Sequence, residues 1–204
     1  YVAPSVVDRV LSGPDGLQLG GSRREVSVLF ADIRGFTAFA ENTTPEHVVE
    51  LLNDYFTVAA DVIFTREGTL DKYLGDAVMA FFNAPEDQPD HPYQAVEAAL
   101  ALQQSVAQFN AQRGIEVLSF GVGIALGDAI VGNVGTSRAM NYTAIGDSVN
   151  RARRLQEFAQ PGQVLVEEGV IQRLGNRVVA RKLGGVQIRG RRGAVVVYEV
   201  QSLA

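Results

Sequence analysis

Two aspartates stand where apolar stretches end, a position in which an unpaired carboxylate is costly. Asp32 follows the strand-like run VSVLFA, and Asp76 follows Gly75 within LDKYLGDAVMAFF. A carboxylate at the mouth of a buried strand needs a cation or several hydrogen-bond donors. A helix N-cap or a surface turn would be the ordinary explanation of Asp32 taken alone. Two such carboxylates close together would repel each other and favour a divalent cation between them.

The composition argues against several other kinds of site. The 204 residues include no cysteine, so disulfides, zinc–thiolate sites and thiol nucleophiles are excluded. We expect both histidines, His47 and His91, at the surface in the first turns of predicted helices, which argues against a catalytic triad or a histidine metal cluster. The net charge of −5 argues against nucleic-acid binding. No apolar run approaches the ~20 residues of a membrane span, and we expect a cytoplasmic domain.

The pattern of apolar residues predicts an alternating series of strands and helices. A strand is predicted over residues 24–33, and a helix begins at Pro45 after the N-cap Thr44 and ends before Gly68. Two short strands flank the Gly75–Asp76 turn. A second long helix is predicted over about residues 92–113, and the stretch VLSFGVGIALGDAIVGNVG predicts a fourth strand and a glycine-rich fifth.

This order of elements predicts the fold class. Strand–helix–strand–strand–helix–strand is the ferredoxin-like α+β pattern (βαββαβ), here with a C-terminal α/β extension. Its first two strands run parallel through a right-handed crossover, and the third lies between them. The end of the first strand therefore lies beside the turn of the hairpin that follows. We expect Asp32 and Asp76 to meet at one edge of the sheet.

The glycine-rich stretch does not match a nucleotide-binding loop. Gly121 and Gly123 fit the dinucleotide fingerprint, but Leu126 occupies its third glycine position, and no GxxxxGK run is present. We interpret these glycines as places where backbone segments approach each other closely.

Four motifs in order carry a resemblance to a known family. They are FADIRGFT, LDKYLGDAVMAFF, GIALGDAIVGNVG and NYTAIGDSVNRARRLQEF. From about Glu25 to Val200 the chain closely resembles the catalytic domain of class III nucleotidyl cyclases. The resemblance implies that Asp32 and Asp76, joined by the backbone carbonyl of Ile33, bind two divalent ions, Mg²⁺ or Mn²⁺.

The resemblance also implies roles for residues that contact the nucleotide. Lys72 and Thr143 match the two base-reading positions, and threonine at the second is typical of a largely bacterial subgroup. Asn150 and Arg154, four apart on one helix face, match the pair that positions the ribose and stabilises the transition state. Arg189 stands where the family usually has a phosphate-binding lysine.

The implied activity is conversion of ATP to cyclic AMP and pyrophosphate at sites shared across a homodimer. A guanylyl cyclase and a catalytically silent nucleotide-binding or dimerisation module are the alternatives. A diguanylate-forming palm domain would share the core, but its GG(D/E)EF-type turn is absent. Some members with threonine at the second base-reading position respond to bicarbonate, which gives a hypothesis of bicarbonate stimulation.

The chain does not begin with methionine, which suggests a fragment of a longer protein. We expect residues 1–24 to be a connector from an upstream regulatory domain, and residues 25–204 to be the catalytic domain. The full protein could be tethered to a membrane through that missing region.

Overall fold

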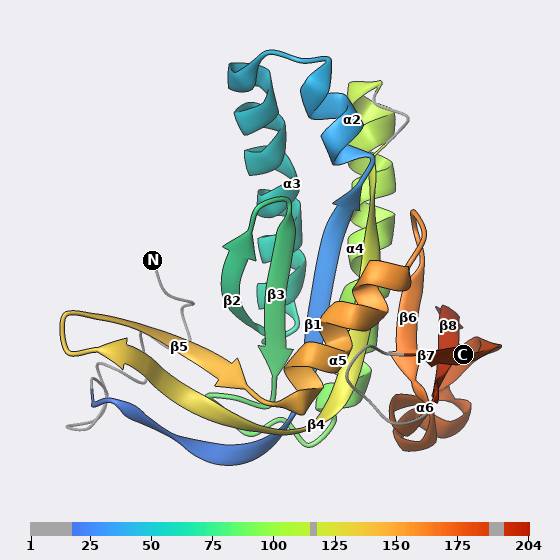
Figure 1. Cartoon of the computed structure of the whole chain (residues 1–204). Coiled ribbons are helices and arrows are strands. Elements are labelled where there is room, and N and C mark those ends of the chain that lie inside the picture. The colour runs from blue at the N-terminus through green and yellow to red at the C-terminus, as the bar shows by residue number, and fades with distance from the viewer. Residues whose placement is uncertain (1–17, 115–117, 188–193) are drawn as a thin grey trace.

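A single mixed sheet with helices on both faces organises the chain (Figure 1). The computed structural model describes residues 18–114, 118–187 and 194–204. Seven strands lie in the order β2-β3-β1-β4-β6-β8-β7, and β5 pairs with β4 outside this path. The strands are β1 (Gly20–Arg34), β2 (Thr69–Leu74), β3 (Ala77–Phe82), β4 (Ser119–Thr136), β5 (Ala139–Ile145), β6 (Val164–Glu167), β7 (Val178–Gln187) and β8 (Ala194–Leu203).

The predicted ferredoxin-like core is confirmed. Strands β2, β3, β1 and β4 are neighbours in that order, and each pair is antiparallel. The crossover helices are α3 (Pro45–Thr65) and α4 (His91–Arg113). Thr44 caps α3, since its side chain accepts a hydrogen bond from the backbone N–H of His47, and Gly114 ends α4 in the left-handed conformation.

Strand β1 is buried on both faces, which explains its continuous apolar run. Leu29, Ala31 and Ile33 belong to the core formed with α3 and α4. Val28 and Phe30 belong to a second core, on the face covered by α5 (Asp147–Phe158). Figure 1 shows α5 across the sheet from α3.

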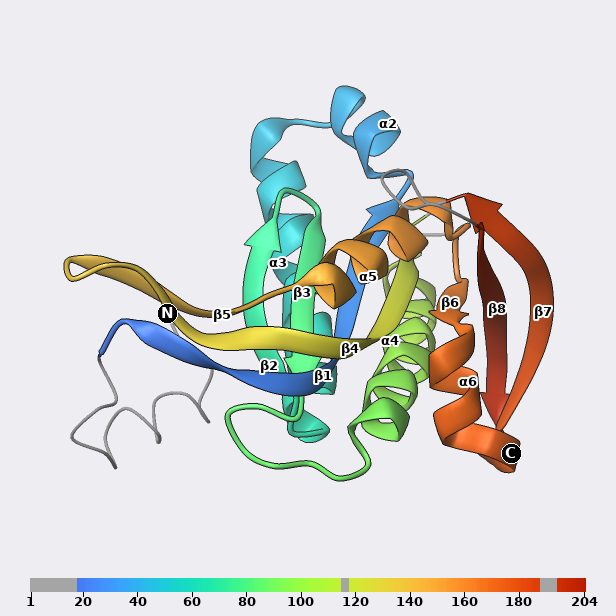
Figure 2. The same cartoon turned by 60° about the horizontal axis from the view of Figure 1, so that its bottom comes forward.

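Three elements differ from the sequence-based expectation. The glycine-rich stretch forms one continuous strand, β4, instead of a fourth and a fifth strand. A short helix, α2 (Phe36–Glu41), was not predicted. Strand β1 begins at Gly20 and pairs with β4 from there, ahead of the predicted strand start at residue 24. Figures 1 and 2 show the beginning of β1, the second half of β4 and β5 extending together from the body as an arm.

The C-terminal extension continues the sheet beyond β4. It contains β6, α6 (Glu168–Leu174), a 3₁₀ turn (Gly175–Arg177), and the antiparallel strands β7 and β8. Strand β6 pairs parallel to β4 and antiparallel to β8. None of the described helices is long and apolar enough to cross a membrane.

The expectation of a surface position for His91 is wrong. The histidine side chain is buried, and its Nδ1 lies 2.9 Å from the hydroxyl of Ser27 on β1. The first turn of α4 packs against the sheet here, which the sequence pattern of a helix start does not reveal. His47 is exposed, as expected.

Candidate active site

Asp32 and Asp76 meet at one edge of the sheet, as the topology predicts. Asp32 is paired with Ala77, the residue that follows Asp76, across β1 and β3. The backbone N–H of Ile33 donates to the carbonyl of Asp76, with a nitrogen–oxygen distance of 3.2 Å. This bond joins the end of β1 to the β2–β3 turn and fixes the two aspartates beside each other.

The two carboxylates line a cavity of about 340 Å³. Asp32 lies on the same face of β1 as Phe30, the face covered by α5. Arg34 and the ion pair of Arg153 with Glu157 also line the cavity, so the acidic pair has both cationic side chains and a third carboxylate beside it. This combination of charges suits a site where carboxylates, metal ions and a polyphosphate come together.

The electrostatics of Asp32 favour a bound cation. Burial raises the pKa of the Asp32 carboxyl, and the neighbouring charge of Asp76 raises it further. Arg34 opposes this shift, with its Nη1 atom 3.0 Å from Asp32 Oδ2, and the same guanidinium donates to the carbonyl of Gln156. The positive charge of Arg34 compensates one carboxylate and leaves Asp76 without an ion-pair partner among the described residues.

The donor set fits an oxygen-preferring ion such as Mg²⁺ or Mn²⁺ better than a metal that requires histidine or cysteine ligands. Among the described residues, no group of three or more His, Cys, Asp or Glu side chains gathers around a common point. Mg²⁺ is commonly bound by one or two carboxylates and completes its shell with water and substrate phosphates. Two aspartates therefore suffice as protein side-chain ligands for such a site, and Ile33 is not among the residues that line the cavity.

Lys72 and Thr143 lie together at the crossing of β2 and β5. The ammonium of Lys72 donates to Thr143 Oγ1 at 3.3 Å. Figure 2 shows β5 passing over β2 and β3 on its way to α5. Neither residue lines the carboxylate cavity. The two positions matched to base reading are thus brought together by one chain.

Asp71 was not identified from the sequence. Its side chain is fully buried and accepts a hydrogen bond from the hydroxyl of Thr143, and Lys72 Nζ lies 3.2 Å from its Oδ1. Burial raises the pKa of the Asp71 carboxyl, while the bonds from Thr143, Lys72 and the backbone of Ala144 lower it. An acidic residue within the predicted strand, beside Lys72, was the only sequence signal.

Helix α5 carries Asn150 and Arg154, the pair matched to ribose positioning and transition-state stabilisation. Asn150 is exposed and Arg154 is half-buried. Neither lines the cavity of the aspartates, which Arg153 of the same helix does line. Arg189 lies outside the described residues, so its role stays a prediction from the resemblance.

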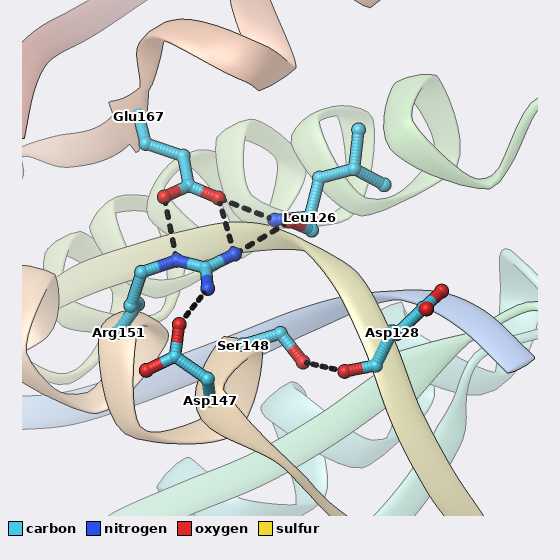
Figure 3. A network of polar contacts seen from close by, with 6 residues as sticks. All are labelled: Leu126, Asp128, Asp147, Ser148, Arg151 and Glu167. Atoms are coloured by element: carbon cyan, nitrogen blue, oxygen red, sulfur yellow. Dashed lines mark hydrogen bonds and ion pairs between the residues drawn. The ribbon is translucent and has the colours of Figure 1, made fainter. Parts of the chain in front are cut away.

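A buried ion-pair network holds α5 to the sheet (Figure 3). Arg151 Nε lies 2.8 Å from Glu167 Oε2, and its Nη2 donates to the carbonyl of Leu126 at 2.7 Å. Glu167 also accepts the backbone N–H of Leu126, at 3.0 Å. Burial lowers the pKa of Arg151, but Glu167 and Asp147 outweigh it, so the pKa is raised. The network fixes the helix that carries Asn150 and Arg154.

Close packing at Gly123 fixes the same helix. A Cβ atom on Gly123 would lie 2.2 Å from the backbone nitrogen of Gln156 and 2.4 Å from the carbonyl oxygen of Ala152. Both atoms belong to the backbone of α5, so only glycine permits this approach. The interpretation of the glycine-rich stretch as a place of close backbone approach is confirmed here.

Comparison with known proteins agrees with this arrangement. A family model described as the adenylate and guanylate cyclase catalytic domain matches residues 21–202. Adenylate cyclase 1 of Rhizobium meliloti (strain 1021) is 37% identical over an alignment of 183 positions that covers 87% of this chain and 28% of that protein. An adenylate cyclase of Anabaena cylindrica is 32% identical over an alignment of 206 positions that covers 93% of this chain and 39% of that protein. The chain thus spans well under half of the length of these relatives.

Two solved structures resemble the chain over nearly their whole length. The guanylyl cyclase Cya2 is 34% identical with a TM-score of 0.84, covering 91% of this chain and 96% of that one. The adenylyl cyclase CyaB from P. aeruginosa is 32% identical with a TM-score of 0.84, covering 90% and 97%. The chain therefore belongs to the family of adenylate and guanylate cyclase catalytic domains.

Proposed function

We propose that the chain is the catalytic domain of an adenylyl cyclase, which converts ATP to 3′,5′-cyclic AMP and pyrophosphate. The observation that carries the proposal is the contact between Lys72 and Thr143. Overall sequence similarity does not indicate whether the substrate is ATP or GTP, because the identity to the guanylyl cyclase Cya2 and to the adenylyl cyclase CyaB is nearly equal. We therefore infer the substrate from the chemistry of Lys72 and Thr143.

A lysine and a threonine together suit adenine. Adenine offers an acceptor at N1 and a donor at its 6-amino group, so Lys72 would donate to the first and Thr143 accept from the second. Guanine presents a donor at N1, which the ammonium of Lys72 cannot accept, and an acceptor at O6. An unpaired buried polar group costs about 1–3 kcal/mol, so the mismatch at Lys72 disfavours GTP, and the match at Thr143 depends on the direction of its hydroxyl hydrogen.

The aspartate cavity would hold the metal ions. Asp32, Asp76 and the backbone carbonyl of Ile33 would bind Mg²⁺ or Mn²⁺, which lowers the pKa of the ribose 3′-hydroxyl and neutralises the triphosphate when bound. Arg34 and Arg153 line the same cavity, and their positive charge would favour a bound polyphosphate. Attack of the 3′-oxygen on the α-phosphorus then depends mainly on positioning and charge stabilisation.

Asn150 and Arg154 would act from the partner copy in a homodimer. In our proposal Asn150 orients the ribose, and Arg154 offsets the charge that develops at the α-phosphate. Their absence from the lining of the aspartate cavity supports a site shared between two copies. Large apolar side chains are exposed on the arm, on β2 and at the end of α5, as a protein interface requires: Tyr73, Leu74, Ile130, Val134, Ile145 and Phe158.

The domain would receive its signal from a further part of the full protein. The curated relatives are much longer than this chain, which supports an additional regulatory part in the full protein. The nature of that part, and a response to bicarbonate, remain hypotheses from the resemblance.

Nucleotide turnover tests the proposal. ATP and GTP are supplied in parallel with Mg²⁺ or Mn²⁺, the products are separated by chromatography, and an Asp32→Ala variant serves as the control. We expect cyclic AMP from ATP, and its loss in the variant. Cyclic GMP as the main product would establish the guanylyl cyclase alternative. No cyclic product from a dimeric, folded chain would instead favour a catalytically silent module.

A further inference from the structure

A threonine hydroxyl does not by itself distinguish adenine from guanine. The hydroxyl carries one hydrogen and two lone pairs, so it can accept from the 6-amino group of adenine or donate to O6 of guanine. Selectivity at Thr143 therefore requires a neighbour that fixes the direction of its hydrogen.

Asp71 is placed to fix that direction. The Thr143 hydroxyl donates to Asp71 Oδ2. Lys72 Nζ lies 3.2 Å from Asp71 Oδ1 and 3.3 Å from Thr143 Oγ1. With the side chain of Asp71 fully buried, water does not compete for the Thr143 hydrogen bond.

A β-bulge directs Asp71 to this position. Leu70 pairs with Ala80 and Lys72 pairs with Met79, so Asp71 is the extra residue of β2 opposite β3. Successive residues of a regular strand point to opposite faces, but a bulge changes the direction of a side chain. The bulge therefore allows Asp71 and Lys72, neighbours in sequence, both to reach Thr143.

We propose that Asp71 is a positioning residue that determines base specificity. When Asp71 accepts the hydroxyl hydrogen of Thr143, the Thr143 oxygen presents a lone pair, and no hydrogen, toward the base. The oxygen can then accept from the 6-amino group of adenine, and it repels O6 of guanine. Lys72, held between Asp71 and Thr143, keeps a remaining N–H for N1 of adenine. The inference rests on the proposed adenylyl cyclase activity and explains its selectivity.

The test is the ratio of kcat/KM for ATP to kcat/KM for GTP in an Asp71→Asn variant. The amide of asparagine can donate to Thr143, which frees the hydroxyl hydrogen to point at O6 of guanine. We expect the ratio to fall about tenfold, with a gain for GTP. Asp61→Asn, on the exposed face of α3, is the matched control and should leave the ratio unchanged. A purely structural role of Asp71 would lower both rates and leave the ratio unchanged.

A double variant keeps the test decisive if the single variant does not fold. Asp71→Asn combined with Thr143→Asp returns one carboxylate to the cluster and supplies an acceptor that needs no orienting neighbour. We expect it to restore the ATP preference. An unchanged ratio in the single variant, or a folded double variant without ATP preference, overturns the inference and leaves the adenylyl cyclase proposal intact. A wild-type chain that prefers GTP, or turns over neither nucleotide, overturns both.

Discussion

The ammonium nitrogen of Lys72 lies 3.3 Å from the hydroxyl oxygen of Thr143, although 71 positions separate the two residues in the chain. One copy of the domain thus brings together the two positions that we propose read the base, where β5 crosses β2. Neither residue lines the cavity that contains Asp32 and Asp76. In our proposal these are two separate half-sites, and their combination from two copies would give two equivalent active sites about a twofold axis.

Complementation between inactive variants tests this shared arrangement. Asp32→Ala removes the metal half-site, and Asn150→Ala removes the ribose-positioning half. We expect each variant alone to be inactive. An equal mixture should recover about a quarter of the wild-type rate, because half of the dimers are mixed and each mixed dimer has one intact site. Cyclic AMP formation is the measurement, with sedimentation to establish dimers. A mixture that stays inactive while both variants dimerise contradicts shared sites.

Substitution at Gly123 should displace α5. In Gly123→Ala the new methyl group would overlap the backbone of Ala152 and Gln156, and backbone cannot move aside as a flexible side chain can. We expect a loss of about 1–3 kcal/mol in the free energy of unfolding, measured with urea. Gly169→Ala in α6 is the control, because no atom lies within 4 Å of its Cβ position, and alanine favours helix. Equal stability of the two variants would rule out the steric explanation.

The meeting of Asp32 and Asp76 was predictable because the order of elements fixes which strands are neighbours. The continuous strand β4 was not predicted, because glycines in a sequence usually indicate the end of a strand. In the structure Gly123 lies within the strand, where the backbone of α5 packs against it. Asp71 escaped prediction because a bulge interrupts the alternation of side chains along β2. The burial of His91 was not predicted because it depends on how the first turn of α4 packs against β1.

Loss of Arg151 should destabilise the fold. Arg151→Met would leave Glu167 buried without its ion-pair partner, since the two side chains are only 12% and 11% exposed. Breaking such a pair costs about 3–5 kcal/mol, and replacing both members by apolar residues is often nearly neutral. We therefore expect a large fall in the unfolding free energy for Arg151→Met and partial recovery on adding Glu167→Met.

A neighbouring arginine provides the control for that experiment. Arg153 Nε lies 3.6 Å from Glu157 Oε1, and both side chains are more than half exposed. Arg153→Met should change the unfolding free energy by less than about 0.5 kcal/mol. Similar losses for the two arginine variants would show that the buried network does not stabilise α5.

The burial of His91 should make the fold less stable in acid. Burial lowers the pKa of His91 below its usual 6.5; Arg173 lowers it too, while Glu25 and Asp90 oppose the shift. Between the lowered pKa and 6.5, the unfolded chain binds more protons at this position than the folded chain does. The contribution of neutral His91 to stability is therefore present above pH 6.5 and is lost as the pH falls through the lowered pKa.

Urea unfolding at about pH 7.5 and about pH 5 measures this contribution. We expect the fall in unfolding free energy between the two pH values to be smaller in His91→Gln, whose amide retains a hydrogen-bonding group toward Ser27. His47→Gln is the matched control, because His47 is exposed and should leave the pH dependence unchanged. If His91→Gln and His47→Gln lose the same stability between the two pH values as the wild type, the acid sensitivity arises from other groups. A reduced loss in His91→Gln alone would assign it to the buried imidazole, where α4 begins against β1.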